Sequence, residues 1–137
     1  MIRHATAIWN GTGKEGKGNL STQSAALSKT PYSFLSRFEE GEGTNPEELI
    51  AAAHAGCFSM KLAFELSGKG FIPTSIETSC AIALENGVIS RSELKVTATV
   101  PEINKDQFDE IAHAAKDNCP VSKLLNTEIS LETTLHS

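Results

Sequence analysis

The pattern of apolar and polar residues divides the chain into strand-like and helical stretches. In the first third, polar and apolar residues alternate through much of the sequence, which is typical of strands with one face in water. Segments rich in glycine and lysine interrupt this alternation, the first of them at Asn10-Gly11. The pattern therefore predicts three strands, over residues 2–9, 20–27 and 32–38.

The next stretch is almost wholly apolar and predicts a long helix over residues 46–67. Asn45 is suited to cap the helix, Pro46 to occupy its first position, and Glu48 to reach back in a capping box. Apolar residues spread over more than one stripe, so we expect a core helix that is covered on most sides. These residues are Leu49, Ile50, Ala53, Cys57, Met60, Ala63, Phe64 and Leu66.

Two paired strands follow the predicted core helix. Apolar and polar residues alternate over residues 75–85 and again over 88–100, until Pro101 ends the second strand. Asn86 and Gly87, which lie between the two stretches, are typical of a tight hairpin turn. The pattern thus predicts a β-hairpin with one face exposed to solvent.

The remaining residues predict two helices and a last strand. Asn104 and Gln107 are suited to cap a helix over residues 105–117, and Pro120 to begin a short one. Alternation returns over residues 129–135. The expected order is βββαββααβ, and strands on both sides of a core helix favour an α+β fold over a doubly wound sheet.

Length and composition are those of an ordinary globular protein. The 137 residues suit a single domain, 1–137, and 39% are hydrophobic and 21% charged. The net charge of -5 disfavours nucleic acid as a partner. The start of the chain lacks the apolar core of a signal peptide, and no stretch of about 20 apolar residues predicts a membrane span. We therefore expect a cytoplasmic protein whose three cysteines stay reduced between catalytic events.

Two of the cysteines occupy positions that suit redox chemistry. Cys57 lies inside the apolar helix, and Cys119 immediately precedes Pro120, where the short helix should begin. A thiol at a helix N-terminus has a lowered pKa and therefore a larger thiolate fraction. The alternative is two buried thiols that never meet. Cys80 lies on the inward face of its strand and is expected to be a small core residue.

Two apparent motifs carry less weight. Residues 11–16 match G-x-G-x-x-G, but no helical stripe follows, so a hairpin loop is favoured over a dinucleotide site. His54 precedes Cys57 by three residues and shares its helix face, which is compatible with a base or a metal ligand. A solvated or core-edge histidine is the favoured interpretation, and no metal site is predicted.

Four segments of the chain form a specific pattern, and with them the chain resembles the osmotically inducible protein C (OsmC) family. The likeness covers essentially the whole chain and is closer to OsmC proper than to the sister organic hydroperoxide resistance (Ohr) branch. The segments are Phe34-Leu35-Ser36-Arg37-Phe38, Gly43-Thr44-Asn45-Pro46-Glu47-Glu48-Leu49-Ile50, Ala52-Ala53-His54-Ala55-Gly56-Cys57-Phe58-Ser59-Met60 and Cys119-Pro120-Val121-Ser122.

The resemblance implies an OsmC-like fold, with antiparallel and mixed sheets around a long central helix, in an intertwined homodimer. It also implies a thiol-dependent peroxidase that reduces organic hydroperoxides better than hydrogen peroxide. By likeness, Cys57 is the peroxidatic cysteine, Cys119 the resolving cysteine, and Glu47 the partner of an essential arginine that Arg37 matches best. No bound cofactor is implied, and the reductant would be a dithiol such as dihydrolipoamide.

Helix geometry adds an expectation of its own. Glu47 and Cys57 are ten residues apart on one helix, which corresponds to about 15 Å of rise. If Glu47 serves the Cys57 site, it must come from a second, antiparallel copy of the helix, so that the sites lie at the subunit interface. The alternative is that Arg37 and Glu47 form a surface ion pair worth under about 1 kcal/mol.

An apolar site mouth is expected to favour organic hydroperoxides over hydrogen peroxide. Its candidates are Phe38, Phe58, Met60 and Phe64, which also suit a plain core. Two other functions stay open. One is a thiol redox sensor without turnover, and the other is a module that binds an apolar ligand.

Overall fold

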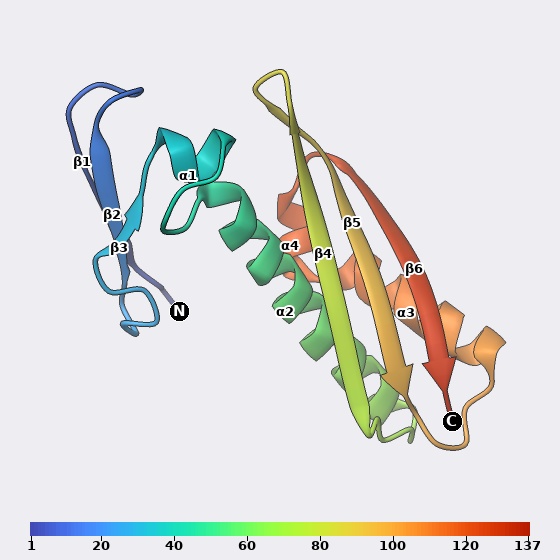
Figure 1. Ribbon diagram of the computed structural model, residues 1–137. Coiled ribbons are helices and arrows are strands. Elements are labelled where there is room, and N and C mark those ends of the chain that lie inside the picture. The colour runs from blue at the N-terminus through green and yellow to red at the C-terminus, as the bar shows by residue number, and fades with distance from the viewer. The chain divides into compact units, whose positions relative to one another are not determined.

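A computed structural model describes all of residues 1–137 (Figure 1). The chain forms two compact units, Met1–Leu49 and Ile50–Ser137, and each is described by itself. Strands and helices are present in both units, so the α+β class predicted from the sequence is confirmed. The expectation of a single domain stays a prediction.

An antiparallel three-stranded sheet makes up most of the first unit, in the order β1 (Ala5–Asn10), β2 (Lys17–Thr22) and β3 (Thr30–Tyr32). The loop over residues 11–16 joins β1 to β2 as a hairpin, as expected, and no helix follows it. The rings of Trp9 and Tyr32 lie with their centres 5.2 Å apart. Gly18 lies between them, since a Cβ there would come within 2.5 Å of the Trp9 ring.

The predicted strand over residues 32–38 is wrong beyond its first residue, because β3 ends at Tyr32. Phe34–Phe38 form the short helix α1. Ser33 and Ser36 cap it reciprocally, because the Ser33 hydroxyl accepts from the Ser36 amide and the Ser36 hydroxyl accepts from the Ser33 amide. This serine capping box places Phe34 and Phe38 one turn apart, with ring centres separated by 4.9 Å.

The long helix α2 spans Pro46–Gly68 and begins where the sequence predicts. The Asn45 side chain accepts from the Glu48 amide at 2.8 Å, but the Glu48 carboxylate accepts from the Thr44 hydroxyl rather than closing a capping box. By length and composition, α2 alone among the helices is long and apolar enough to cross a membrane. The same features belong to core helices of soluble proteins.

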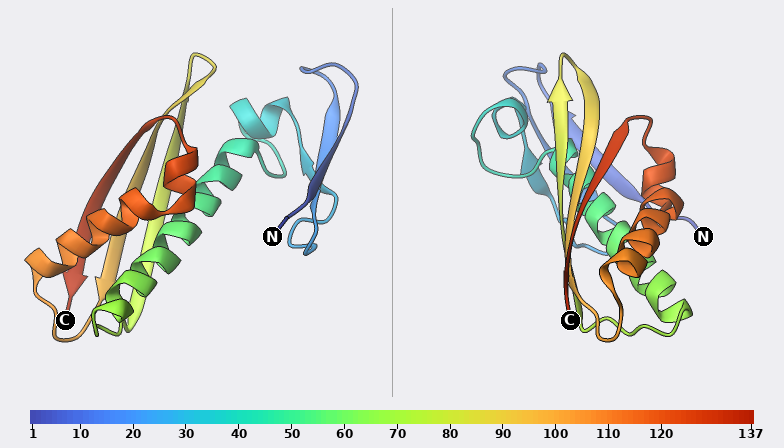
Figure 2. Two further views of the ribbon diagram at one scale, coloured as in Figure 1. Left: turned by 180° about the vertical axis from the view of Figure 1, so that it is seen from behind. Right: turned by 90° about the vertical axis from the view of Figure 1, so that its right-hand side faces the viewer.

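A three-stranded mixed sheet forms the second unit together with its helices. β4 (Ser75–Glu85) and β5 (Val88–Thr99) form the predicted antiparallel hairpin, and Asn86 and Gly87 at its turn both have positive φ. β6 (Glu128–His136) runs parallel to β5 on its other side. Figure 2 shows the helices of this unit on one face of the sheet.

Two helices connect β5 to β6. α3 spans Lys105–Asn118 and has the predicted capping box of Asn104 and Gln107, which confirms that prediction. Cys119 ends α3 and also caps α4 (Pro120–Leu124), as its amide donates to Ala115 and its carbonyl accepts from Lys123. The sequence thus predicts both helices correctly.

The core of the second unit lies between the sheet and the helices. It contains the buried apolar residues Phe58, Leu62, Leu66, Leu94, Val96, Ala98, Val100, Ile103, Phe108, Ile111, Ala112, Ala115 and Cys119. On α2 only the stripe of His54, Phe58, Leu62 and Leu66 is buried. The expectation that α2 is covered on most sides is therefore wrong for the single chain, because Met60 and Phe64 on another face are 65% and 67% exposed.

Candidate active site

Two cysteines that are far apart in the sequence meet in the second unit. Cys57 lies in the middle of α2 and is half-buried, and Cys119 lies between α3 and α4 and is fully buried. Their sulfur atoms are 2.9 Å apart, and both thiols are free. Two thiols at this distance can form a disulfide once one of them is oxidised.

The surroundings of Cys57 in this chain disfavour the thiolate form of its side chain. Burial raises the pKa of Cys57 above its ordinary value, and the neighbouring Cys119 thiol raises it further. The backbone amide of Val121 and the charge of Lys61 act in the opposite direction but do not outweigh burial. A nearby cation would act in the same direction as Lys61 and lower this pKa.

His54 does not face the cysteine pair but lies in a buried network of hydroxyl groups. Its Nδ1 is 2.6 Å from Ser92 Oγ, and its Nε2 is 2.8 Å from Ser122 Oγ. Ser92 Oγ is also 3.2 Å from the sulfur of Cys80, which lies half-buried on β4. His54 is therefore a buried core histidine with both nitrogens satisfied, and burial lowers its pKa.

The sequence carries no signal that singles out Ser92 or Ser122 as partners of His54, because serine is common in every environment. Groups of three or more histidine, cysteine or acidic side chains placed to hold a metal ion are absent from the structure. The polar contacts of His54 are made by the hydroxyl groups of Ser92 and Ser122, and the Cys80 sulfur lies 3.9 Å from its Nδ1.

Arg37 and Glu47 form a bidentate ion pair in the first unit. Arg37 Nε lies 3.0 Å from Glu47 Oε1, and Arg37 Nη2 lies 3.1 Å from Oε2. The Glu47 side chain is only 12% exposed, and that of Arg37 is 40% exposed. The glutamate therefore fixes the orientation of the guanidinium, whose carbon also lies 5.0 Å from the centre of the Phe38 ring.

The four predicted substrate contacts are found in three different settings. Phe38 is half exposed and lines a hollow of about 270 Å³ in the first unit, together with Arg37. Phe58 is fully buried in the core, and Met60 and Phe64 are exposed on α2. The other side chains of the hollow are Trp9, Tyr32, Ser33 and Phe34, which no local sequence pattern groups together.

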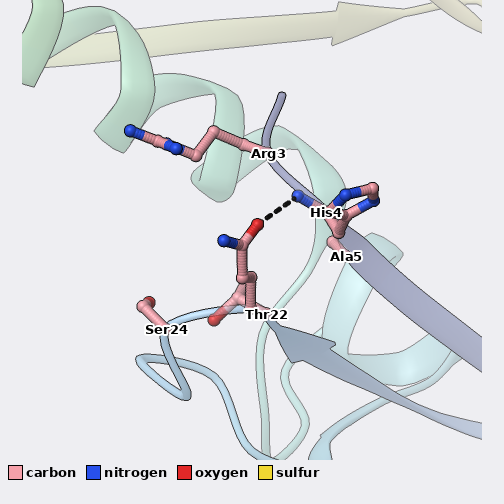
Figure 3. A pocket seen from close by; sticks show the side chains of 6 residues that line it. Arg3, His4, Ala5, Thr22 and Ser24 are labelled. Atoms are coloured by element: carbon pink, nitrogen blue, oxygen red, sulfur yellow. Dashed lines mark hydrogen bonds between the residues drawn. The ribbon is translucent and has the colours of Figure 1, made fainter. Parts of the chain in front are cut away.

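A second hollow of the first unit, of about 580 Å³, lies beside the chain start (Figure 3). Arg3, His4 and Ser24 line it, and the His4 amide donates to the side chain of Gln23. None of its lining side chains is a thiol.

Fold and site together define an α+β thiol protein with two free cysteines in contact across a helix pair. The family described as "OsmC-like protein" matches residues 39–134. This chain therefore belongs to the OsmC family, as the resemblance of its motifs predicts.

Curated relatives cover nearly the whole chain. The peroxiredoxin OsmC of Escherichia coli strain K12 is 47% identical over 135 residues, which are 96% of this chain and 94% of that protein. The organic hydroperoxide resistance protein of Xanthomonas axonopodis pv. citri is 32% identical over 137 residues, which are 96% of this chain and 92% of that protein. The higher identity is on the OsmC side, as the motifs indicate.

A solved structure confirms the fold. The OsmC-like protein of Mycoplasma pneumoniae superposes with a TM-score of 0.78 over 100% of this chain and 99% of that protein, at 12% identity. The predicted OsmC-like fold, with two small sheets and a long central helix, is therefore confirmed.

Proposed function

We propose that this chain reduces organic hydroperoxides to alcohols, with Cys57 as the peroxidatic cysteine and Cys119 as the resolving cysteine. The enzyme class follows from the family, since the chain is a cysteine-based peroxidase related to peroxiredoxin OsmC. The observation that carries the two residue roles is the 2.9 Å separation of the Cys57 and Cys119 sulfur atoms.

The proposed reaction has three steps. The Cys57 thiolate attacks one peroxide oxygen, the O–O bond breaks, and the departing alkoxide takes a proton to become the alcohol, which leaves a sulfenic acid on Cys57. The Cys119 thiol then attacks this sulfur, so that a disulfide forms and water leaves. An external dithiol, for example dihydrolipoamide, reduces the disulfide by exchange and returns both thiols. No bound cofactor takes part.

Arg37 supplies the cation that the Cys57 site requires in this proposal. Its charge lowers the pKa of the thiol, and its N–H groups stabilise the negative charge on the departing oxygen. Glu47 holds the guanidinium in place through the two contacts at 3.0 and 3.1 Å. The fork geometry and the low exposure of Glu47 support this role over that of a plain surface ion pair.

The arginine reaches the thiol from a second copy of the chain in this proposal, because Glu47 and Cys57 are about 15 Å apart along one helix. We propose a homodimer in which antiparallel copies of α2 pack together and each active site contains residues of both subunits. The exposed Met60 and Phe64 on α2 support it, since large apolar side chains at this exposure favour burial against a partner. The small side chains Ala53 and Gly56 lie on the same exposed face.

The substrate is an organic hydroperoxide with an apolar body. Phe38, Met60 and Phe64 are placed at the site mouth in this proposal, and their exposure in the single chain suits contact with a ligand or a partner. Phe58 is fully buried, so in this proposal it packs behind the site and does not line its mouth. We place the enzyme in the cytoplasm, where dithiol reductants keep such cysteines reduced.

The decisive experiment measures hydroperoxide consumption with excess dithiol for the wild type, Cys57→Ser and Cys119→Ser. Cys57→Ser is expected to lose all turnover, and Cys119→Ser to consume one equivalent and then recycle poorly. Cys80→Ser is the matched control, because Cys80 contacts Ser92 rather than the other two thiols. Turnover that survives in Cys57→Ser would exclude this mechanism, and a wild type that is oxidised once without recycling would indicate a redox sensor.

A further inference from the structure

A buried hydrogen bond joins the helices of the two cysteines at a point away from the sulfur atoms. His54 precedes Cys57 by one turn of α2, and Ser122 follows Cys119 by three residues in α4. His54 Nε2 and Ser122 Oγ lie 2.8 Å apart. Because His54 is fully buried and Ser122 is 8% exposed, water does not compete for this contact.

The imidazole ring is also fixed from its other side. His54 Nδ1 lies 2.6 Å from Ser92 Oγ on β5. A neutral imidazole donates from one nitrogen and accepts at the other, so both serines are satisfied at once. Turning the ring would leave a buried polar atom without a partner, which is unfavourable. His54 therefore connects β5 to α4 through a side chain of fixed orientation.

The short helix α4 carries two groups that face Cys57. These are the Cys119 thiol, 2.9 Å from the Cys57 sulfur, and the Val121 amide, which is hydrogen bonded to that sulfur. α4 has only five residues and so has little stability of its own. Two polar side-chain contacts join this segment to α2, namely the thiol pair and the His54–Ser122 bond.

The thiol contact cannot by itself hold α4 during the reaction, because it changes when Cys57 becomes a sulfenic acid. The His54–Ser122 bond involves neither sulfur atom, so oxidation of Cys57 removes neither of its partners. We propose that His54, through Ser122, is a positioning residue that holds Cys119 against Cys57 for disulfide formation. This inference rests on the proposed two-cysteine mechanism and assigns His54 a role in its second step.

The test separates the two chemical steps in a single turnover. Reduced protein is mixed with one equivalent of tert-butyl hydroperoxide and quenched at set times, and intact mass with dimedone trapping measures the sulfenic acid and the disulfide. Ser122→Ala and His54→Ala are expected to slow disulfide formation at least about tenfold relative to oxidation of Cys57. With excess hydroperoxide, they should also accumulate more sulfinic acid on Cys57.

Ser59→Ala is the matched control, because the Ser59 hydroxyl ties α2 to Thr78 of β4 at 2.7 Å and does not contact α4. It should form the disulfide at the wild-type rate, and Ser122→Thr, which keeps a hydroxyl, should recover most of the rate. Ser122→Ala also keeps the test valid if His54→Ala fails to fold.

The possible results are distinguishable. Wild-type rates in Ser122→Ala, or equal slowing in Ser59→Ala, would overturn the positioning role while leaving the peroxidase mechanism intact. A wild type that forms no Cys57–Cys119 disulfide would overturn the two-cysteine mechanism and this inference with it.

Discussion

Cys57 lies in a site that does not by itself favour the thiolate. Burial and the Cys119 thiol raise its pKa, and within the second unit only the Val121 amide and Lys61 act against them. A buried thiol is protected from adventitious oxidation but reacts slowly. In the proposed mechanism, Arg37 lowers this pKa and so converts the protected thiol into a nucleophile.

Arg37→Met is therefore expected to slow the reaction of Cys57 with an organic hydroperoxide by about tenfold or more, and to raise the pKa of its alkylation. The reason is that methionine fills the same space without charge or N–H donors. The measurement is the rate of iodoacetamide modification of Cys57 as a function of pH, alongside the single-turnover oxidation rate.

Arg91→Met provides the control for this prediction. Arg91 also pairs with two glutamates, Glu85 and Glu93, but on the exposed hairpin of the second unit. Its replacement should leave both rates unchanged, as exposed ion pairs contribute little. An unchanged alkylation pKa in Arg37→Met would remove Arg37 from the mechanism.

At the scale of elements, the sequence predicts what local chemistry decides. The caps of α2 and α3 and the Asn86-Gly87 turn fall where expected, because capping and turn residues act over three or four positions. α1 is missed because its capping box uses Ser36 in place of the usual glutamate, which leaves an aromatic stretch that also suits a strand.

Long-range contacts are beyond this kind of prediction. The proximity of Cys57 and Cys119 follows from how α2 and α4 pack on one sheet face, which no local pattern specifies. The burial of His54 between Ser92 and Ser122 depends on residues 38 and 68 positions away. The exposure of Met60 and Phe64 on α2 likewise depends on tertiary packing that no local pattern specifies.

The contact of α2, β5 and α4 through His54 predicts a pH dependence of stability. Burial lowers the pKa of His54 below its ordinary value of 6.5, so the unfolded chain binds more protons in the window below 6.5. The contribution is fully present above pH 6.5 and is lost as the pH falls towards the lowered folded pKa. One proton accounts for at most about 1.4 kcal/mol per pH unit.

Urea unfolding at pH 7.5 and 5.5 measures this loss. In His54→Gln, which has no titrating group at this position, the difference in unfolding free energy between the two pH values should be smaller than in the wild type. The other histidines, His4, His113 and His136, are present in both proteins and cancel in the comparison. Equal differences would show that His54 is not the group responsible.

At the scale of the whole molecule, the single chain leaves two features unexplained. One face of α2 exposes the large apolar side chains Met60 and Phe64. In addition, Glu47 orients the Arg37 guanidinium, but no thiol of the first unit lies beside it. The proposed symmetric dimer would account for both, because a two-fold axis gives each subunit the same contact and would bring residues of one copy to the site of the other. If each active site contains residues of both subunits, two inactive variants with defects in different residues can form a mixed dimer that has one intact site.

Mixed dimers of Cys57→Ser and Arg37→Met test whether each site uses both subunits. Each variant alone is expected to have little activity. A mixed dimer has one site with Cys57 from one chain and Arg37 from the other, so unfolding and refolding an equal mixture should restore about a quarter of wild-type sites. If Arg37 serves the Cys57 of its own chain, every site carries a defect and the refolded mixture stays as inactive as its components.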